Sequence, residues 1–191
     1  MKEVFEVEKN YIKNENYKKN LDILLDLVPD YFYEVEASST GKYHPKFALG
    51  EHGLVRHTKV AVAIANEVLN LECMDEYFSH KEKDLILIAL ILHDSFKLGN
   101  PKERYTRFDH PLLVGKFLEE NKDKLTFTDM ELKFLINTIA SHMGQWNTNS
   151  YSDVVLPKPK TKYQIFVHMC DYLASRKFIN VEFDEKNNII K

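Results

Sequence analysis

An apolar run followed by an adjacent histidine and aspartate constrains the fold of this chain more than any other feature. The run DLILIALILHD covers residues 84–94, and its middle eight residues are all apolar. A helix that is apolar on all sides is buried, so it lies in the centre of a domain. Ser79 and Glu82 form a capping-box pattern ahead of it, which predicts a helix start there. The sequence therefore predicts a central helix that ends at His93 and Asp94.

Other apolar stretches have helical periodicity, so the predicted fold is all-α. The segment LVRHTKVAVAIANEVLN places His57 on its apolar stripe. Capping-box patterns at Thr128 and Thr161 open two further helices, and Asp109 is predicted to cap a helix that starts with His110. The tail NVEFDEKNNIIK has two short β-rich runs around a polar turn, a pattern that allows a small C-terminal β-hairpin.

The length of 191 residues predicts one main domain with room for short additions. The first 20 residues are polar and weakly patterned, and a brief amphipathic helix over 21–28 ends at Pro29. From Ala37 to Gly53 the chain is polar and irregular, which indicates a long loop of the kind that often carries function. We expect an N-terminal helical arm, a main domain and a tail, over 1–36, 37–180 and 181–191.

Composition excludes several classes of protein. A formal net charge of −3, from 26 Lys and Arg against 29 Asp and Glu, predicts no binding of bulk duplex nucleic acid. Cys73 and Cys170 stand far apart and are expected to be reduced and buried. No signal-peptide core occurs, and no window approaches the ~20 apolar residues of a membrane span. These features predict a cytoplasmic protein without membrane contact.

Several ionisable side chains fall on apolar helix faces. His57, His93, Asp94, His142 and Asp171 each occupy such a position. Burial of these groups without partners would cost several kcal/mol each. One such histidine is usually a hydrogen-bonded core residue, but five such groups in one chain favour a shared metal. Imidazoles with carboxylates suit Zn, Fe, Mn, Co or Ni.

The order of these residues resembles the HD superfamily of metal-dependent phosphohydrolases. The segments GLVRHTKVAVAIA and ALILHDSFK are similar to the first-helix motif of the family and to its "LLHD-x-x-K" helix end. IASHMGQW resembles the later "I-x-x-HH-G" motif, and MCDYLASR resembles the final Asp helix. The resemblance extends over residues 38 to about 178 and implies an HD-domain helical bundle over 37–180.

The resemblance implies a first metal held by His57, His93, Asp94 and Asp171. Some branches of the superfamily bind a second metal through further histidines, and the matching positions here are His110 and His142. Asp94 would then bridge one divalent transition metal ion (Mn, Fe, Co, Ni or Zn) and a second. Members with two metals often have a second adjacent histidine, where this chain has Met143. The second ion is therefore expected to be weakly bound, exchangeable or absent.

The implied mechanism is direct hydrolysis by a metal-activated water. A divalent ion lowers the pKa of its bound water from 15.7 toward ~7. Asp94 is the candidate catalytic residue that positions or deprotonates this water. Lys97 matches the lysine of the helix-end motif and is expected to bind a phosphate oxygen. Phe96 replaces the usual glycine and is expected to narrow the pocket, to offer a stacking surface for a base, or to pack in the core.

Loops on either side of the motifs supply candidate substrate-binding residues. Arg104 and Arg107 precede His110 and are candidate phosphate clamps, as is Lys42 on the long loop. Further candidates are Lys102, Arg56 and Arg176, and Trp146 and Tyr151 as surfaces on which a base stacks. The remaining histidines have no motif position and are read as structural or surface residues: His44, His52, His80 and His168.

The predicted function is a phosphomonoesterase or phosphodiesterase. The expected partner is a phosphorylated small molecule, a nucleotide or a short oligonucleotide. Similarity of the SHMG and PKPK segments to the HD domain of a bacterial 3′-to-5′ exoribonuclease favours nucleotide-derived substrates. Two alternatives stay open: a non-catalytic module that binds metal and nucleotide, and a di-iron oxygenase of HD type. The sequence does not define an oligomeric state.

Overall fold

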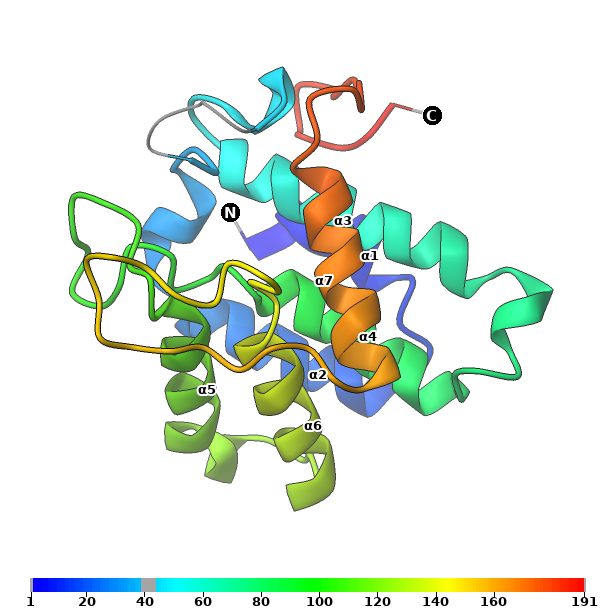
Figure 1. Ribbon diagram of the computed structural model, residues 1–191. Coiled ribbons are helices and arrows are strands. Elements are labelled where there is room, and N and C mark those ends of the chain that lie inside the picture. The colour runs from blue at the N-terminus through cyan, green and yellow to red at the C-terminus, as the bar shows by residue number, and fades with distance from the viewer. Residues whose placement is uncertain (1, 39–43, 191) are drawn as a thin grey trace.

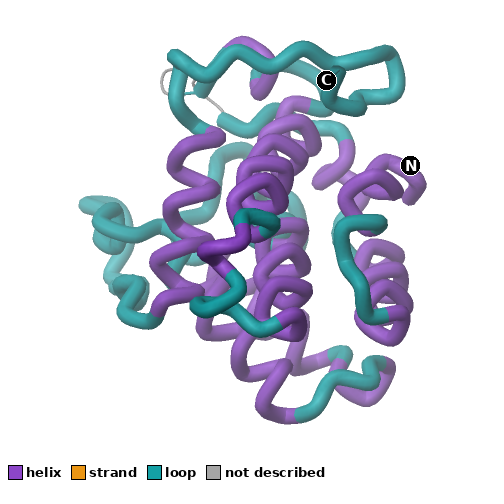
Figure 2. Tube along the Cα trace, turned by 90° about the vertical axis from the view of Figure 1, so that its right-hand side faces the viewer, coloured by secondary structure: helices purple, strands orange, loops and turns teal. Residues whose placement is uncertain are grey.

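The computed structural model describes residues 2–38 and 44–190, and over these ranges the chain is helical. Figure 1 shows the helices packed around α4, and Figure 2 shows the same arrangement from the side. No strand occurs in either range. The prediction of an all-α fold is confirmed. The α-helices are α1 Glu6–Lys9, α2 Glu15–Leu27, α3 Gly53–Leu69, α4 His80–Leu92, α5 His110–Glu120, α6 Asp129–Ala140 and α7 Lys162–Ala174. Five short 3₁₀ helices join them: Lys2–Phe5, Asp30–Tyr33, Lys46–Ala48, Glu72–Met74 and Lys122–Lys124.

The central position of α4 is confirmed. Every residue of this helix from Asp84 to Leu92 is buried. It contacts α3, α6 and α7 on different sides and α2 as well, so its apolar surface is covered all round. The helix ends at Leu92, and His93 and Asp94 follow in the interior. The packing of α4 thus carries this pair into the centre of the domain.

Three helix starts agree with the capping boxes in the sequence. The side chains of Ser79, Thr128 and Thr161 each accept a hydrogen bond from the backbone N–H of the residue three positions on. The side chain of that residue in turn accepts a hydrogen bond from the backbone N–H of the capping residue. The prediction for α5 is half wrong. Asp109 occupies the N-cap position, but its carboxylate makes no cap hydrogen bond because it pairs with Arg107.

The N-terminal residues are part of the main core. Phe5, Ile12 and Tyr17 are buried in the same apolar cluster as α4. The Asp84 side chain accepts hydrogen bonds of 2.9 Å from the backbone N–H groups of Lys13 and Asn14. Helix α2 begins at residue 15, earlier than the weak sequence pattern indicated. The domain boundary expected between residues 36 and 37 stays a prediction.

The C-terminal tail forms a turn without strands. A single antiparallel bridge joins Phe183 to Ile189, so the hairpin that the sequence allowed is reduced to one bridge. Asn188 accepts a hydrogen bond from Lys59. Asn187 accepts one from Arg56. These contacts attach the tail to α3.

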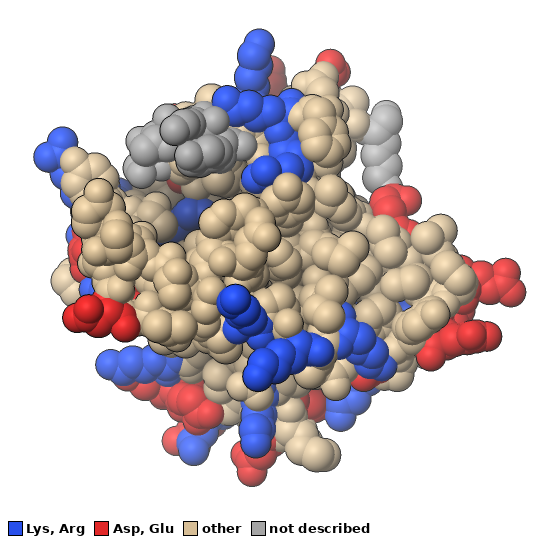
Figure 3. All heavy atoms as spheres, in the orientation of Figure 1, with Lys and Arg blue, Asp and Glu red and all other residues tan. Residues whose placement is uncertain are grey.

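Two expectations from composition receive different outcomes. Cys170 is buried, as predicted, but Cys73 is exposed because it lies in the 3₁₀ turn after α3. None of the helices in the described ranges combines the length and apolar character of a membrane span. On the face shown in Figure 3, Lys and Arg side chains lie in separate groups around a largely uncharged middle.

Candidate metal centre

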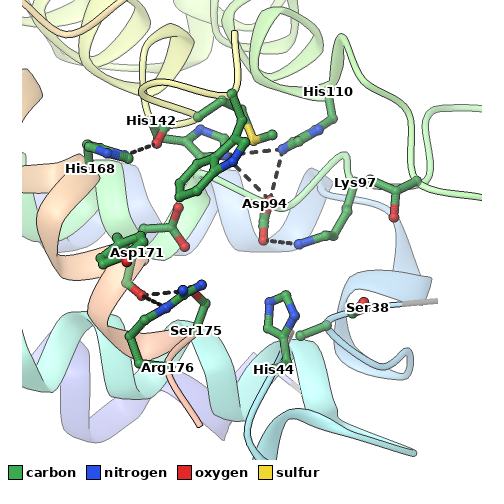
Figure 4. Close-up of a pocket in the computed structure, with 15 residues that line it drawn as sticks. Ser38, His44, Asp94, Lys97, His110, His142, His168, Asp171, Ser175 and Arg176 are labelled. Atoms are coloured by element: carbon green, nitrogen blue, oxygen red, sulfur yellow. Dashed lines mark hydrogen bonds and ion pairs between the residues drawn. The ribbon is translucent and has the colours of Figure 1, made fainter. Parts of the chain in front are cut away.

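Five helix ends and faces bring the predicted ligands together. His57 lies in α3, His93 and Asp94 follow α4, and Asp171 lies in α7. The other two are His110, the first residue of α5, and His142, which follows α6. All are buried except Asp171, whose side chain is 19% exposed. Figure 4 shows the carboxylates facing one cavity.

The first group contains the four residues expected to hold one metal. His57 Nε2 lies 2.9 Å from Asp171 Oδ1 and 4.0 Å from Asp94 Oδ2. His93 Nε2 lies 3.5 Å from each of the same two oxygens. The ligand atoms of His57, His93 and Asp94 all lie within 4.8 Å of one another, a spacing that one ion could span.

The second group uses the other oxygen of Asp94. His110 Nε2 lies 3.0 Å from Asp94 Oδ1, and His142 Nε2 lies 3.7 Å from it. The two imidazoles are 3.2 Å apart through their Nε2 atoms. Asp94 therefore presents Oδ2 to one set of residues and Oδ1 to another, which is the geometry of a bridging carboxylate.

Backbone carbonyls orient three of the imidazoles. The Nδ1 atoms of His93, His110 and His142 lie 2.6, 2.6 and 2.9 Å from the carbonyl oxygens of Leu90, Arg107 and Ile139. A carbonyl only accepts, so each Nδ1 carries the proton. Each Nε2 then keeps its lone pair for a metal, the arrangement that is usual around ligating histidines.

Unpaired buried atoms test whether a metal fits. His93 Nε2 and Asp94 Oδ1 are buried without a hydrogen-bond partner. Such groups are costly unless something coordinates them. Asp94 lines the cavity and His93 Nε2 lies 3.5 Å from its Oδ2, and the set of imidazoles and carboxylates suits a divalent transition metal. The residues present therefore fit one or two such ions.

The electrostatics keep three of the candidate ligands in states that bind metal, whereas at His93 the effect of burial is outweighed by Asp94 and Asp171, which raise its pKa. Burial raises the pKa of Asp94, but Lys97 and His93 outweigh it, and the pKa lies well below 3.8. Burial is likewise outweighed at Asp171 by His57 and His93, so that its pKa is also well below 3.8. Burial, together with His93 and His110, lowers the pKa of His142 to about 3. Ionised carboxylates and a neutral imidazole are the forms that coordinate metal.

A cavity of about 590 Å³ opens beside these groups. Asp94, His110, His142 and Asp171 lie along its wall, and Lys97 joins them from the turn after α4. Lys97 Nζ lies 2.5 Å from Asp94 Oδ2, so its charge is held next to the candidate bridge. The volume falls within the range of small-molecule sites.

The structure does not bring the predicted arginine clamps into this cavity. Arg107 pairs with Glu103 and Asp109. Arg104 stacks over Tyr105 and is absent from the described cavity wall, to which this loop contributes Thr106. The other basic candidates lie elsewhere too: Lys102 over the ring of Tyr31, and Arg56 bonded to the carbonyls of Phe47, Leu49 and Glu51. Lys42 lies outside the described residues.

Two histidines that were read as structural border the site. The ring of His44 packs edge-on against His57 with centroids 5.3 Å apart, and it lines the cavity. Burial, with His57 and Lys97 nearby, lowers the pKa of His44 to about 3. His168 Nδ1 lies 2.7 Å from the carbonyl oxygen of His142. The spacing of His168 three residues before Asp171 could have placed it on the same helix face, whereas His44 lies in an irregular loop without periodicity.

The aromatic candidates separate into two sets. Trp146 lines the cavity and stacks on Tyr172, with centroids 5.6 Å apart and planes at 16°. Tyr151 is 95% exposed, away from the described cavity wall. Phe96 packs against Phe117 in the core, so its core interpretation holds.

Comparison with protein families gives one match. The family model described as "HD domain" matches residues 54–176, well over half of the chain. The chain belongs to the HD-domain family. The matched range contains all six candidate ligands of this HD domain. No curated protein and no solved structure matches the chain. HD domains form a superfamily of metal-dependent phosphohydrolases, and the buried His and Asp clusters here fit divalent metal binding.

Proposed function

We propose that this HD domain hydrolyses a phosphate ester of a nucleotide or short oligonucleotide. One observation carries the proposal above the others. The two oxygens of Asp94 face two separate sets of histidines, and Lys97 stands beside that carboxylate on a cavity wall. A structural core would not need a cation, a carboxylate and neutral imidazoles to converge on a cavity.

The candidate ligands divide between two ions. His57, His93, Asp94 and Asp171 would hold the first, and Asp94 with His110 and His142 would hold the second. A divalent ion, when bound, lowers the pKa of water and neutralises charge on the phosphoryl group. Met143 supplies no imidazole to the second group, which leaves it with fewer ligands than the first.

The residues of the chain would then position the reactants for direct hydrolysis. With only the first ion bound through Oδ2, Asp94 Oδ1 would be free to accept a hydrogen bond from the attacking water and to take its proton during the step. Lys97 donates N–H groups to a phosphate oxygen while Asp94 fixes its position. The water oxygen would bond to phosphorus, the bond from phosphorus to the leaving oxygen would break, and the proton taken from the water would pass to the leaving oxygen. No covalent bond forms between enzyme and substrate.

The cavity supports a nucleotide-sized substrate. Its volume of about 590 Å³ exceeds what a single phosphate group fills. Trp146 is 46% exposed beside Tyr172, so part of the indole is free to stack with a base. We propose that the phosphate lies near Asp94 and Lys97 and that the base lies along Trp146.

Two other functions use the same residues. In a non-catalytic module the ion orders the helices and the cavity only binds a nucleotide. In a di-iron oxygenase both groups of ligands hold iron. The Lys97 ammonium beside Asp94 favours the phosphohydrolase, because it adds a phosphate-binding cation that oxygen chemistry does not require.

The decisive experiment is an activity screen with an inactive variant. The protein is incubated with phosphomonoesters, cyclic nucleotides and short RNA in the presence of Mn, Co or Ni. We expect wild type to release product and Asp94→Ala to lose at least about 100-fold in rate, since it removes both metal bridging and proton uptake. Equal rates for the two proteins would end the catalytic proposal.

Two lysine variants distinguish a role in substrate binding from a role in metal binding. Lys97→Ala should lower turnover by roughly 10- to 100-fold and leave the metal content unchanged. Lys102→Ala is the matched control, because Lys102 lies over the ring of Tyr31 and away from the ligands. Loss of metal from the Lys97 variant would assign this residue to metal-site integrity instead.

A further inference from the structure

Arg176 differs from the other arginines of the chain. It lines the cavity at the end of α7, next to Ser175. Arg56 is bonded to backbone carbonyls, and Arg107 is paired with two carboxylates. Arg104 packs on Tyr105. Arg176 is thus the arginine that the fold directs to the candidate site.

The guanidinium of Arg176 is fixed in place without a carboxylate. Its Nε donates to the carbonyl of Tyr172 at 3.1 Å, and its Nη2 donates to Ser175 Oγ at 2.7 Å. Its central carbon lies 4.1 Å from the centroid of the Tyr172 ring. No carboxylate in residues 2–38 or 44–190 forms an ion pair with it. The positive charge is therefore oriented, and the described carboxylates form no ion pair with it.

The end of a helix alone does not account for this arrangement. A cation near a helix C-terminus interacts favourably with the helix dipole. That interaction requires only proximity to the last carbonyls, and an exposed side chain of lysine would satisfy it. Arg176 instead lies over an aromatic ring and is set into the wall of a cavity. Its planar fork is suited to two oxygens of one anion.

Lys97 and Arg176, two cations of the described cavity wall, have different surroundings. Lys97 is already matched by Asp94 at 2.5 Å. In Figure 4, Lys97 lies on one side of the carboxylates and Arg176 lies on the other. A phosphate held at Asp94 and Lys97 would leave Arg176 available for a different group.

We infer that Arg176 binds a second phosphate group of the substrate. The preferred substrates would then be nucleotides with two phosphate groups rather than one. Trp146 and Tyr172 stack on one another and form an aromatic part of the same cavity wall, along which a base could lie. This inference rests on the proposed function for the identity of the first phosphate position.

Binding of two nucleotides by the protein as purified tests the inference. The probes are adenosine 5′-monophosphate and adenosine 3′,5′-bisphosphate, and affinity is measured by calorimetry. For wild type we expect the bisphosphate to bind about tenfold more tightly, the effect of one charge-assisted contact. Arg176→Gln should remove this difference and leave monophosphate affinity within about twofold. Equal affinity of wild type for both nucleotides would overturn the inference.

Two further variants guard against a general loss of structure or charge. Arg176→Lys retains the charge and should recover only part of the preference, because lysine lacks the planar fork. Arg104→Gln removes one positive charge outside the cavity wall and should keep the full preference. A preference lost equally in the Arg104 variant would show that net charge, not Arg176, selects the bisphosphate.

The outcome is distinguishable from failure of the proposed function. A bisphosphate preference without turnover of any phosphate ester would reject the phosphohydrolase and keep Arg176 as an anion-binding residue. Turnover with no contribution from Arg176 to bisphosphate preference would reject the inference and keep the phosphohydrolase.

Discussion

At the scale of single residues, local backbone geometry prepares the imidazoles. His93, His110 and His142 each place Nδ1 against the carbonyl of the residue three positions earlier. The proton on Nδ1 leaves Nε2 free, so the choice of tautomer follows from where each helix begins or ends. His168 holds one of these ligands from outside, because its Nδ1 forms a hydrogen bond with the backbone carbonyl of His142.

We predict that His168 positions the second group of ligands. His168→Ala removes the bond to the His142 carbonyl and the ring against which Gly144 packs. Metal affinity of the second group should fall by roughly 10- to 100-fold, the usual effect of losing an outer partner. The measurement is a metal titration against a competing chelator.

Two histidine variants control this titration. His168→Asn retains a donor near the same position and should recover part of the affinity. His80→Ala removes an exposed histidine at the start of α4 and should have no effect. Unchanged affinity in His168→Ala would show that the bond to His142 is dispensable.

At the scale of elements, the sequence predicts what local contacts determine. The starts of α4, α6 and α7 follow from side chains three residues apart, and all three were predicted correctly. The start of α5 was only half right, because Arg107 takes the carboxylate that would cap the helix. Helix α7 ends at Ala174, within the MCDYLASR motif.

The candidate site was predictable to a similar extent. The six ligands were predicted from motif order, and the structure brings them together. His44 was not, because its position depends on packing against His57 from another segment. Arg176 was only a further candidate, and its orientation comes from Tyr172 and Ser175, its neighbours in sequence. Arg107 has two acids close by in the sequence and pairs with both in the structure, although the sequence also allowed it a role in phosphate binding.

We predict a pH-dependent contribution from the capping box of α6. Burial raises the pKa of Glu131, but Lys81, Tyr17 and Thr128 outweigh it and lower the pKa to about 2. An acid with a lowered pKa stabilises the fold above its unfolded value of 4.5, and this stabilisation is lost as the pH falls toward 2. Glu131→Gln should therefore lower the free energy of unfolding by about 2 kcal/mol at pH 7 and by less at pH 3.

Urea unfolding at several pH values measures this difference. Glu119→Gln, at an exposed position of α5, is the control and should change stability by less than about 0.5 kcal/mol. A difference between wild type and Glu131→Gln that stays constant from pH 7 to pH 3 would contradict the role of the ionised carboxylate.

At the scale of the whole molecule, both ends of the chain close on α3. Lys59 Nζ lies 3.1 Å from Glu8 Oε2, and both side chains are buried. The same amine donates to Asn188 in the tail at 3.0 Å. These contacts join residues far apart in sequence, and no local pattern in the polar N-terminal segment predicts them. The segment therefore packs as part of the domain.

We predict that the N-terminal segment contributes strongly to stability. Phe5 is 1% exposed and stacks on Phe32 with centroids 5.7 Å apart. Phe5→Ala should lower the free energy of unfolding by about 3–5 kcal/mol. Val7→Ala, at a position 42% exposed, should cost less than about 1 kcal/mol. Similar small losses in both variants would support an independent arm over residues 1–36.

The metal centre is the central claim, and elemental analysis of protein purified without chelator tests it most directly. We predict one to two equivalents of a divalent transition metal in wild type and almost none in His93→Ala, because His93 belongs to the first group. If wild type holds two equivalents, His110→Ala should hold about one. Wild type without metal, or a His93→Ala variant that retains the wild-type amount, would contradict the assignment of this site.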